Sequence, residues 1–183
     1  FDLTGRIAVV TGASAGLGRG EAIALARQGA DVAIIARRAE KLDEVAAEIR
    51  GLGRRCLPVV CDVTEPEQIE SAIGQVIAEY GKVDILVNNT GGGPSAPLED
   101  ISDEMFMYHV QLELMATFRF TRGFGKYMLE RGYGRVINIA SILGLGGIGV
   151  PGEAKCIAYE SCKGAVLNFT RGAAVEWARR GVT

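Results

Sequence analysis

A glycine-rich stretch between a strand and a helix constrains the fold of this chain more than any other feature. Residues 6–11 form a short apolar, β-branched run, which is typical of a buried parallel strand. The glycine-rich stretch 12–18 follows at once, and a helical pattern continues over about 17–28. In such a unit the glycines let the backbone approach a pyrophosphate, and the helix N-terminus favours its negative charge. The sequence therefore predicts a dinucleotide site here, in preference to a purely structural turn.

Strands and helices alternate along the rest of the chain. Apolar runs predict strands at 31–36, 56–61, 83–87 and 135–140, and amphipathic stretches predict helices at 39–52, 65–80, 103–130 and 158–180. This order predicts an α/β fold, a Rossmann-type doubly wound parallel sheet flanked by helices. We expect a single dinucleotide-binding domain over residues 1–183.

Composition and charge argue against several classes of function. The net charge of −2 leaves no electrostatic footprint for nucleic acid. The sequence has no apolar run long enough to span a bilayer and no signal peptide, so we expect a cytoplasmic protein without membrane partners. The four cysteines show no metal-binding spacing, which predicts reduced thiols and no metal site. His109 is the only histidine, and we expect it to be a helix residue and not a catalyst.

The residues after the second predicted strand bear on the choice of cofactor. An acidic residue about 20 positions beyond the glycine loop would accept the ribose hydroxyls of NAD. Ala36 stands there instead, followed by Arg37 and Arg38. Because a guanidinium forks onto phosphate oxygens, the sequence favours the 2′-phosphate of NADP. NAD remains the alternative, with the two arginines in a solvated loop.

Tyr159 and Lys163 carry the predicted chemistry. Four residues apart on a helix, they lie on one face. A phenol ionises near pH ~10 in water, and an ammonium held close favours the phenolate. The pair can therefore act as a tuned acid and base. Ser141 stands at the carboxyl end of the strand predicted at 135–140, where ligands of such sheets bind.

Taken together, these motifs resemble those of the short-chain dehydrogenases/reductases over the whole chain. The carrying residues are Thr11-Gly12-x-x-x-Gly16-x-Gly18, Asp62, Asn88-Asn89-Thr90-Gly91, Ser141 and Tyr159-x-x-x-Lys163. The opening residues 1–5 and the strand pattern look most like bacterial 3-oxoacyl-carrier-protein reductases and sugar-acid dehydrogenases.

The resemblance implies a role for each matching position. Tyr159 would exchange a proton with the alcohol or ketone oxygen, Ser141 would hydrogen-bond the same oxygen, and Lys163 would hold the nicotinamide ribose. Residues expected to bind the cofactor are Gly12, Ser14, Gly16, Leu17, Gly18, Arg37, Arg38, Asp62, Val63, Asn89, Thr90, Gly91, Tyr159 and Lys163. The implied substrate is a small alcohol or ketone, and we expect a homo-oligomer, either a dimer or a tetramer.

One departure from the family concerns the long helix, where relatives carry an Asn that relays protons through water to the lysine. Aligning residues 113–118 with the family's Asn-Leu-x-x-x-Phe puts Glu113 at that position, whereas aligning 110–112 with Val-Asn-Leu puts Gln111 there. Residues two apart point about 200° away from each other on a helix, so only one can face the site. The longer match favours Glu113, which we count with Ser141, Tyr159 and Lys163 as a candidate catalytic residue.

The second departure is the end at residues 181–183, where the family would begin a sixth strand. We expect a C-terminally incomplete record that lacks the family's last strands and substrate lid. A chain of only these residues would expose the Tyr159 helix and the strand at 135–140 and should fold poorly. The function expected is hydride transfer between NADP(H) and a secondary alcohol or ketone. The alternatives are an NAD-linked sugar or sugar-acid dehydrogenase, or a catalytically silent dinucleotide-binding regulatory protein.

Overall fold

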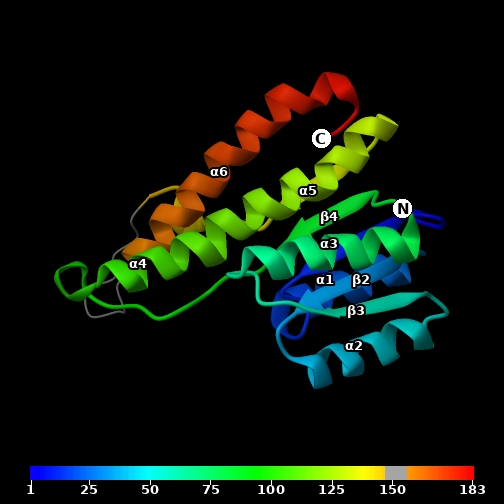
Figure 1. Ribbon diagram of the computed structural model, residues 1–183, viewed down its shortest axis with the longest axis horizontal. Helices are drawn as coiled ribbons and strands as arrows, with labels where there is room; N and C mark the ends of the chain where they lie inside the picture. The colour runs from blue at the N-terminus through cyan, green and yellow to red at the C-terminus, as the bar shows by residue number, and fades with distance from the viewer. Residues whose placement is uncertain (147–155) are drawn as a thin grey trace.

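The computed structural model describes residues 1–146 and 156–183, and its centre is a parallel sheet (Figure 1). Five strands pair in the order β3-β2-β1-β4-β5. Their bounds are β1 (Ile7–Thr11), β2 (Asp31–Ala36), β3 (Cys56–Val60), β4 (Ile85–Asn88) and β5 (Arg135–Asn138). The chain starts in the middle of the sheet and winds outward on both sides, which confirms the predicted doubly wound topology. The strand order reverses between β1 and β4, where such sheets bind ligands.

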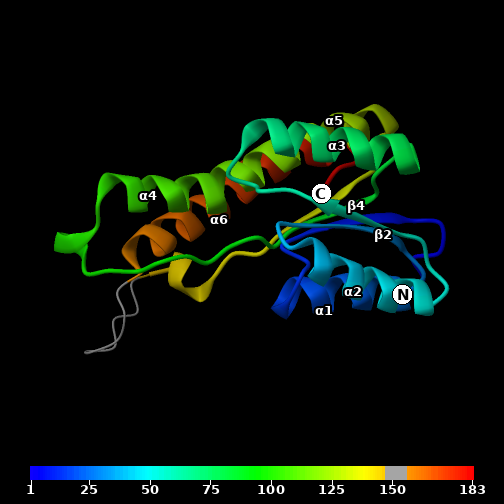
Figure 2. The same ribbon diagram turned by 60° about the horizontal axis from the view of Figure 1, so that its bottom comes forward.

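Helices cover both faces of the sheet (Figure 2). The α1 (Gly16–Arg27) and α2 (Ala39–Gly51) helices lie on one face, and α3 (Pro66–Tyr80), α5 (Ala116–Arg131) and α6 (Ile157–Trp177) lie on the other. The α4 helix (Asp103–His109) and η2 (Val110–Met115) precede α5. Short 3₁₀ turns are η1 (Leu98–Asp100), η3 (Ile142–Gly144) and η4 (Ala178–Arg180). The predicted elements agree with these to within a few residues.

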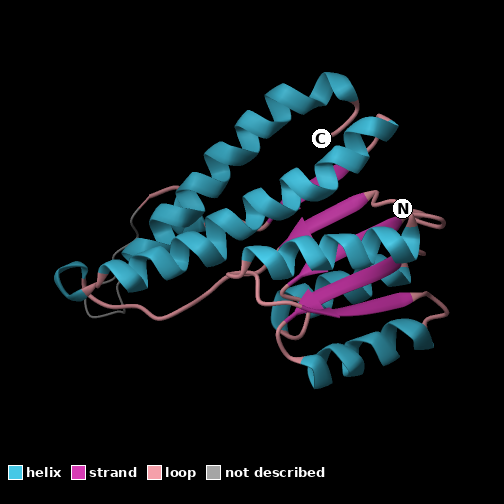
Figure 3. Cartoon of the chain, viewed as in Figure 1, coloured by secondary structure: helices cyan, strands magenta, loops and turns pink. Residues whose placement is uncertain are grey.

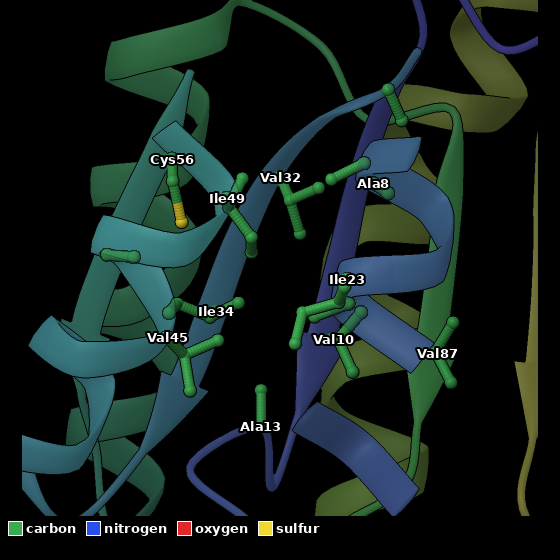
Figure 4. Packing of buried hydrophobic residues seen from close by; sticks show 14 of the residues in the cluster. Ala8, Val10, Ala13, Ile23, Val32, Ile34, Val45, Ile49, Cys56 and Val87 are labelled. Atoms are coloured by element: carbon green, nitrogen blue, oxygen red, sulfur yellow. The ribbon is translucent and has the colours of Figure 1, made fainter. Parts of the chain in front are cut away.

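The side chains of each strand contribute alternately to two hydrophobic cores, because successive side chains point to opposite faces of a sheet. Val10, Val32 and Ile34 pack against Ile23 of α1 and Val45 of α2 (Figure 4). Their immediate neighbours in the strands face the other layer, where they meet α3 and α5. That second core includes Val9, Ala33, Ile35, Leu86, Phe120, Phe124 and Met128.

The long helix predicted over 103–130 is not a uniform α-helix. It runs as α4, η2 and α5 in one continuous rod that extends past the carboxyl ends of the strands (Figure 3), but η2 is a π-helix. The Thr117 hydroxyl donates a hydrogen bond of 2.7 Å to the Glu113 carbonyl, which thereby gains a side-chain partner. Short π segments of this kind often mark functional sites.

Two other segments bear on the expectations for the second half of the chain. The loop predicted over 143–155 begins with η3, and its residues 147–155 lie outside the described part. At the other end, the Thr183 carbonyl accepts a hydrogen bond of 2.8 Å from the Val136 amide, in the place expected for a sixth strand. Ile137 of β5 is 46% exposed and Val175 of α6 is 84% exposed.

Asp84 is a buried charge that joins the sheet to α5. One carboxylate oxygen accepts a hydrogen bond from the Ile7 amide at 2.9 Å and lies 3.0 Å from the Lys82 ammonium. The other accepts from Arg131 at 2.6 Å. Burial alone would raise the pKa of Asp84, but the hydrogen bonds from Ile7, Arg131 and Lys82 outweigh it and hold that pKa below its usual range.

Replacing Asp84 by Ala should lower the free energy of unfolding by about 3 kcal/mol at neutral pH, because its charged contacts are lost and Lys82 and Arg131 are left without their carboxylate partner. Since the folded-state pKa is depressed, this stabilisation is present above the unfolded pKa of about 3.9 and is lost as the pH falls through the folded value. Urea unfolding of the wild type and of Asp84→Ala, at neutral and acidic pH, measures the difference between their free energies of unfolding. A difference that does not become smaller in acid would contradict this account.

Candidate active site

A cleft of about 1060 Å³ lies over the carboxyl ends of the strands. Most of the predicted site residues line it, namely Gly12, Ser14, Leu17, Arg37, Arg38, Asp62, Val63, Asn89, Thr90, Gly91, Tyr159 and Lys163. Four others, Gly16, Gly18, Ser141 and Glu113, are not part of its lining. The fold therefore gathers positions that are far apart in the sequence around one cavity.

The glycine loop lies against the residues that follow β4. The Thr11 hydroxyl accepts hydrogen bonds from the backbone amides of Asn89 and Thr90, at 3.0 and 3.1 Å. A Cβ atom on Gly18 would lie 2.6 Å from the Gly12 carbonyl oxygen, so only glycine fits there without movement of the backbone. Gly12 itself has a φ of 68°, which disfavours any other residue.

The start of α1 offers an anion site. Its N-cap residue, Ala15, has no side chain that could accept from the first amides of the helix, and none caps them in the described residues. Unpaired amides and the positive end of the helix dipole both favour a phosphate at this point. The loop thus has the features that a dinucleotide pyrophosphate requires.

The two arginines after β2 occupy different places. Arg38 donates a hydrogen bond of 3.1 Å to the Ser14 hydroxyl in the glycine loop. Arg37 lies 3.9 Å from the Asp62 carboxylate, which also accepts from the Thr64 amide and hydroxyl at 3.0 and 2.8 Å. Both guanidinium groups line the cleft, and both stand where a phosphate beside the glycine loop could be bound.

Lys163 is fully enclosed at the other end of the cleft. Its ammonium donates a hydrogen bond of 2.7 Å to the Ile139 carbonyl and forms an ion pair of 2.8 Å with Glu113. The two side chains are 5% and 0% exposed. The ammonium also lies 5.5 Å from the centre of the Tyr159 ring, one turn earlier on α6. The structure therefore places a fixed positive charge beside the phenol.

Glu113 and Gln111 do point to different sides, as helix geometry requires. Glu113 faces Lys163, and its other carboxylate oxygen accepts a hydrogen bond of 2.6 Å from the Gly92 amide. Gln111 instead accepts a hydrogen bond of 2.9 Å from Arg119. The longer sequence match therefore identified the residue that contacts the lysine.

The Cys162 thiol lies beside this ion pair. Burial raises the pKa of Cys162 to about 11, and the negative charge of Glu113 adds to the rise. The thiol therefore stays protonated at neutral pH, in line with the expected inert cysteine.

Ser141 follows β5, and its hydroxyl oxygen accepts a hydrogen bond of 3.1 Å from the Leu143 amide. The structure thus shows it as the N-cap of η3. Its predicted contact with substrate stays a prediction.

His109 is the site residue that sequence reasoning missed. Its side chain lines the cleft, is 2% exposed and meets the Tyr159 ring edge-on, with ring centres 6.5 Å apart. The signal in the sequence was its spacing, because His109 stands four residues before Glu113 on the same helical segment. The structure confirms His109 as a helix residue, the last of α4, and adds that its side chain lines the cleft.

The described residues hold no group of three or more acidic, His or Cys side chains that could bind a metal ion. Within the same part of the chain, no helix is long and apolar enough to cross a membrane.

Comparison with known proteins decides the family. The sequence pattern described as short chain dehydrogenase matches residues 6–183. The chain belongs to the short-chain dehydrogenase family. It is accordingly an oxidoreductase of the type that acts on CH–OH and C=O groups.

Two curated relatives show the range within this family. Gluconate 5-dehydrogenase of Gluconobacter oxydans is 35% identical over 182 residues, which is 100% of this chain and 69% of that protein. The 3-oxoacyl-[acyl-carrier-protein] reductase of Synechocystis sp. is also 35% identical over 182 residues, which is 99% of this chain and 72% of that protein. Both kinds of relative agree with the resemblance seen in the sequence motifs.

Solved structures of short-chain dehydrogenases superpose closely on this chain. L-sorbose reductase from Gluconobacter frateurii, complexed with NADPH and L-sorbose, gives a TM-score of 0.91 at 31% identity, over 99% of this chain and 67% of that one. NAD⁺-bound xylitol dehydrogenase gives a TM-score of 0.91 at 30% identity, over 100% of this chain and 68% of that one. Members of nearly equal similarity thus use different nicotinamide cofactors.

Proposed function

We propose that this short-chain dehydrogenase interconverts a secondary alcohol and a ketone with NADP(H), using Tyr159 as the acid and base. The observation that carries the proposal is the fixed ammonium of Lys163 beside the Tyr159 ring, inside the cleft. A positive charge held at this distance favours the phenolate, which is what a tyrosine needs to exchange protons near neutral pH. NADP(H) would supply or accept the hydride at the carbonyl carbon.

The residues of the cleft fit a nicotinamide dinucleotide. The unpaired amides of α1, the close approach at Gly12 and Gly18 and the positive φ of Gly16 suit the pyrophosphate, with Leu17 at the helix start. Asp62 and Val63 would lie near the adenine, and Asn89, Thr90 and Gly91 near its ribose. Arg37 and Arg38, with Ser14, would hold the 2′-phosphate.

The chain's own groups would handle the proton. In reduction, the Tyr159 hydroxyl donates its proton to the carbonyl oxygen as that oxygen gains negative charge, and in oxidation the phenolate takes the proton back. Ser141 would donate a hydrogen bond to the same oxygen. Lys163 would keep its hydrogen bond to the Ile139 carbonyl and its ion pair with Glu113 while it holds the nicotinamide ribose.

The two curated relatives described above suggest two classes of substrate for this chain. One class is sugars or sugar acids, and the other is 3-oxoacyl thioesters. An NAD-linked sugar or sugar-acid dehydrogenase is the second candidate, and the 3.9 Å approach of Arg37 to Asp62 favours it, because that contact partly neutralises the arginine. We do not propose a silent regulatory protein, because the chain belongs to an enzyme family and keeps Tyr159, Lys163 and Ser141. A cytoplasmic homo-oligomer of single-domain subunits remains part of the proposal.

The proposal is tested by supplying gluconate with NADP⁺ or NAD⁺, and a 3-oxoacyl thioester with NADPH or NADH, and following the absorbance of the reduced cofactor. Turnover with NADP(H) on either substrate class supports the proposal. A clear preference for NAD(H) would establish the second candidate instead.

Replacing Tyr159 by Phe removes only the phenolic oxygen, so the helix and the cleft should survive. Positioned proton transfer contributes about 10²–10⁴-fold to rate, and we expect turnover to fall by that much while the dissociation constant of NADPH stays within about threefold by fluorescence titration. A variant that kept half of the wild-type rate would contradict the assignment of Tyr159.

Replacing Arg37 or Arg38 by Ala should weaken NADPH binding more than tenfold, since a hydrogen bond to a charged group contributes about 1.5–3 kcal/mol. NADH binding should change little, because NADH has no 2′-phosphate. Arg27→Ala, an exposed arginine at the far end of α1, is the control. Equal losses for the two cofactors would show that the arginines support the loop and not the phosphate.

Glu113 should shift the pH dependence of alcohol oxidation. Its carboxylate forms the ion pair with Lys163 and thus places a negative charge next to the acid–base pair. Because a nearby negative charge disfavours the ionised form of an acid, replacing Glu113 by Asn should move the rise of the oxidative rate to lower pH. Gln111→Asn, on the side facing Arg119, should leave the profile unchanged. A profile that responds only to Gln111→Asn would refute the role of Glu113.

A further inference from the structure

The loop after β4 is attached to the long helix at two points. The Gly92 amide donates to the Glu113 carboxylate at 2.6 Å, and the Pro94 carbonyl lies 2.8 Å from Nε2 of His109. The carbonyl can only accept, so Nε2 carries the hydrogen in this contact. Both side chains are buried, with exposures of 0% and 2%.

Two glycines allow the loop to lie this close. A Cβ atom on Gly91 would stand 2.6 Å from Oε2 of Glu113, and one on Gly93 would stand 2.7 Å from Cε1 of His109. Gly91 thus packs on the Glu113 side chain, and the next residue, Gly92, donates a hydrogen bond to it. In the same way Gly93 packs on His109, and the next residue, Pro94, accepts a hydrogen bond from it. We refer to these four residues together with His109 and Glu113 as the clasp.

Each side chain of the clasp also touches one residue of the proposed acid–base pair. Glu113 forms the ion pair with Lys163, and the His109 ring contacts the edge of the Tyr159 ring. Other titratable neighbours at this end of the cleft include Cys162 on α6, Cys156 just before α6 and Tyr108 on α4. The loop, the helix and the two residues of α6 thus form one connected set of contacts.

Stability alone gives no reason for a histidine at this place. Nδ1 of His109 is buried and has no hydrogen-bond partner among the described residues, which carries a desolvation penalty. An apolar side chain would fill the same space without that penalty. The imidazole does, however, supply a donor that reaches the Pro94 carbonyl, and a flat ring that contacts Tyr159.

We propose that His109 is a positioning residue, which holds the loop 91–94 against the helix and thereby fixes the Tyr159 ring for proton transfer. The proposal rests on the proposed function for the role of Tyr159. The loop forms one wall of the cleft, so a loosened loop leaves the phenol less well placed relative to the reacting oxygen. Misplacement of a reacting group lowers the chemical step more than it lowers binding.

A matched pair of variants isolates the hydrogen bond. His109→Gln and His109→Met both lose the ring and have side chains of the same length, but only Gln carries an N–H donor that can stand near the position of Nε2. Hydrogen exchange of the backbone amides in residues 91–97 should be about five- to tenfold faster in His109→Met than in His109→Gln, the size expected for one neutral hydrogen bond. Equal exchange rates in the two variants would refute the claim that the hydrogen bond from His109 holds the loop. This measurement needs neither substrate nor cofactor.

Turnover measurements then distinguish a role of His109 in positioning Tyr159 from a purely structural role. The kcat of His109→Met should fall about five- to tenfold below that of His109→Gln, with the NADPH dissociation constant within about threefold in both. Faster exchange in His109→Met with an unchanged kcat would overturn the positioning role. Tyr159→Phe, measured in the same assay, distinguishes the two proposals. If Tyr159→Phe stays active, the proposed function is wrong. If Tyr159→Phe loses activity while the two His109 variants turn over equally, only the role proposed for His109 is wrong.

Discussion

The buried ion pair between Lys163 and Glu113 is the contact on which the proposed chemistry depends. It joins α6 to the π segment of the long helix, and the Ile139 carbonyl after β5 completes the set of partners around the ammonium. A buried charge without partners would be neutralised or would disrupt its surroundings. Three elements that are distant in sequence must therefore come together before the ammonium can stand beside Tyr159.

Such a pair is a costly way to stabilise a protein. Desolvation of two buried ions largely cancels their attraction, whereas removal of only one partner typically destabilises a protein by about 3–5 kcal/mol. The pair is thus weak evidence for added stability and better evidence for a defined arrangement. Here the arrangement includes the Gly92 amide, so the position of the Lys163 charge is coupled to the loop that lines the cleft.

The parallel sheet, its doubly wound topology and many of the residues that line the cleft could be predicted from the sequence, because local patterns mark them. Buried strands read as apolar runs, and the glycine stretch 12–18 requires a close approach that the structure shows at Gly18. The buried ion pairs of Asp84 could not be predicted from such patterns. This residue stands just before β4 in a predicted strand, and the groups that neutralise it, Lys82, Arg131 and the Ile7 amide, are brought to it by tertiary packing.

His109 and the π-helix were missed for a related reason. A pattern of helical periodicity assumes a constant 3.6 residues per turn, and η2 departs from it where Thr117 bonds back to the Glu113 carbonyl. The four-residue spacing of His109 and Glu113 was a signal in the sequence, but spacing alone does not show what a helix face contacts. The importance of His109 emerges only from the contacts it makes across the cleft, with Pro94 on the loop and Tyr159 on α6. The helical segment that carries Glu113, at the position where the resemblance implies an amide, therefore also carries the ring that packs against Tyr159. Glu113 contacts Lys163 and His109 contacts Tyr159, so the effects proposed for them, on pH dependence and on kcat, are physically separable.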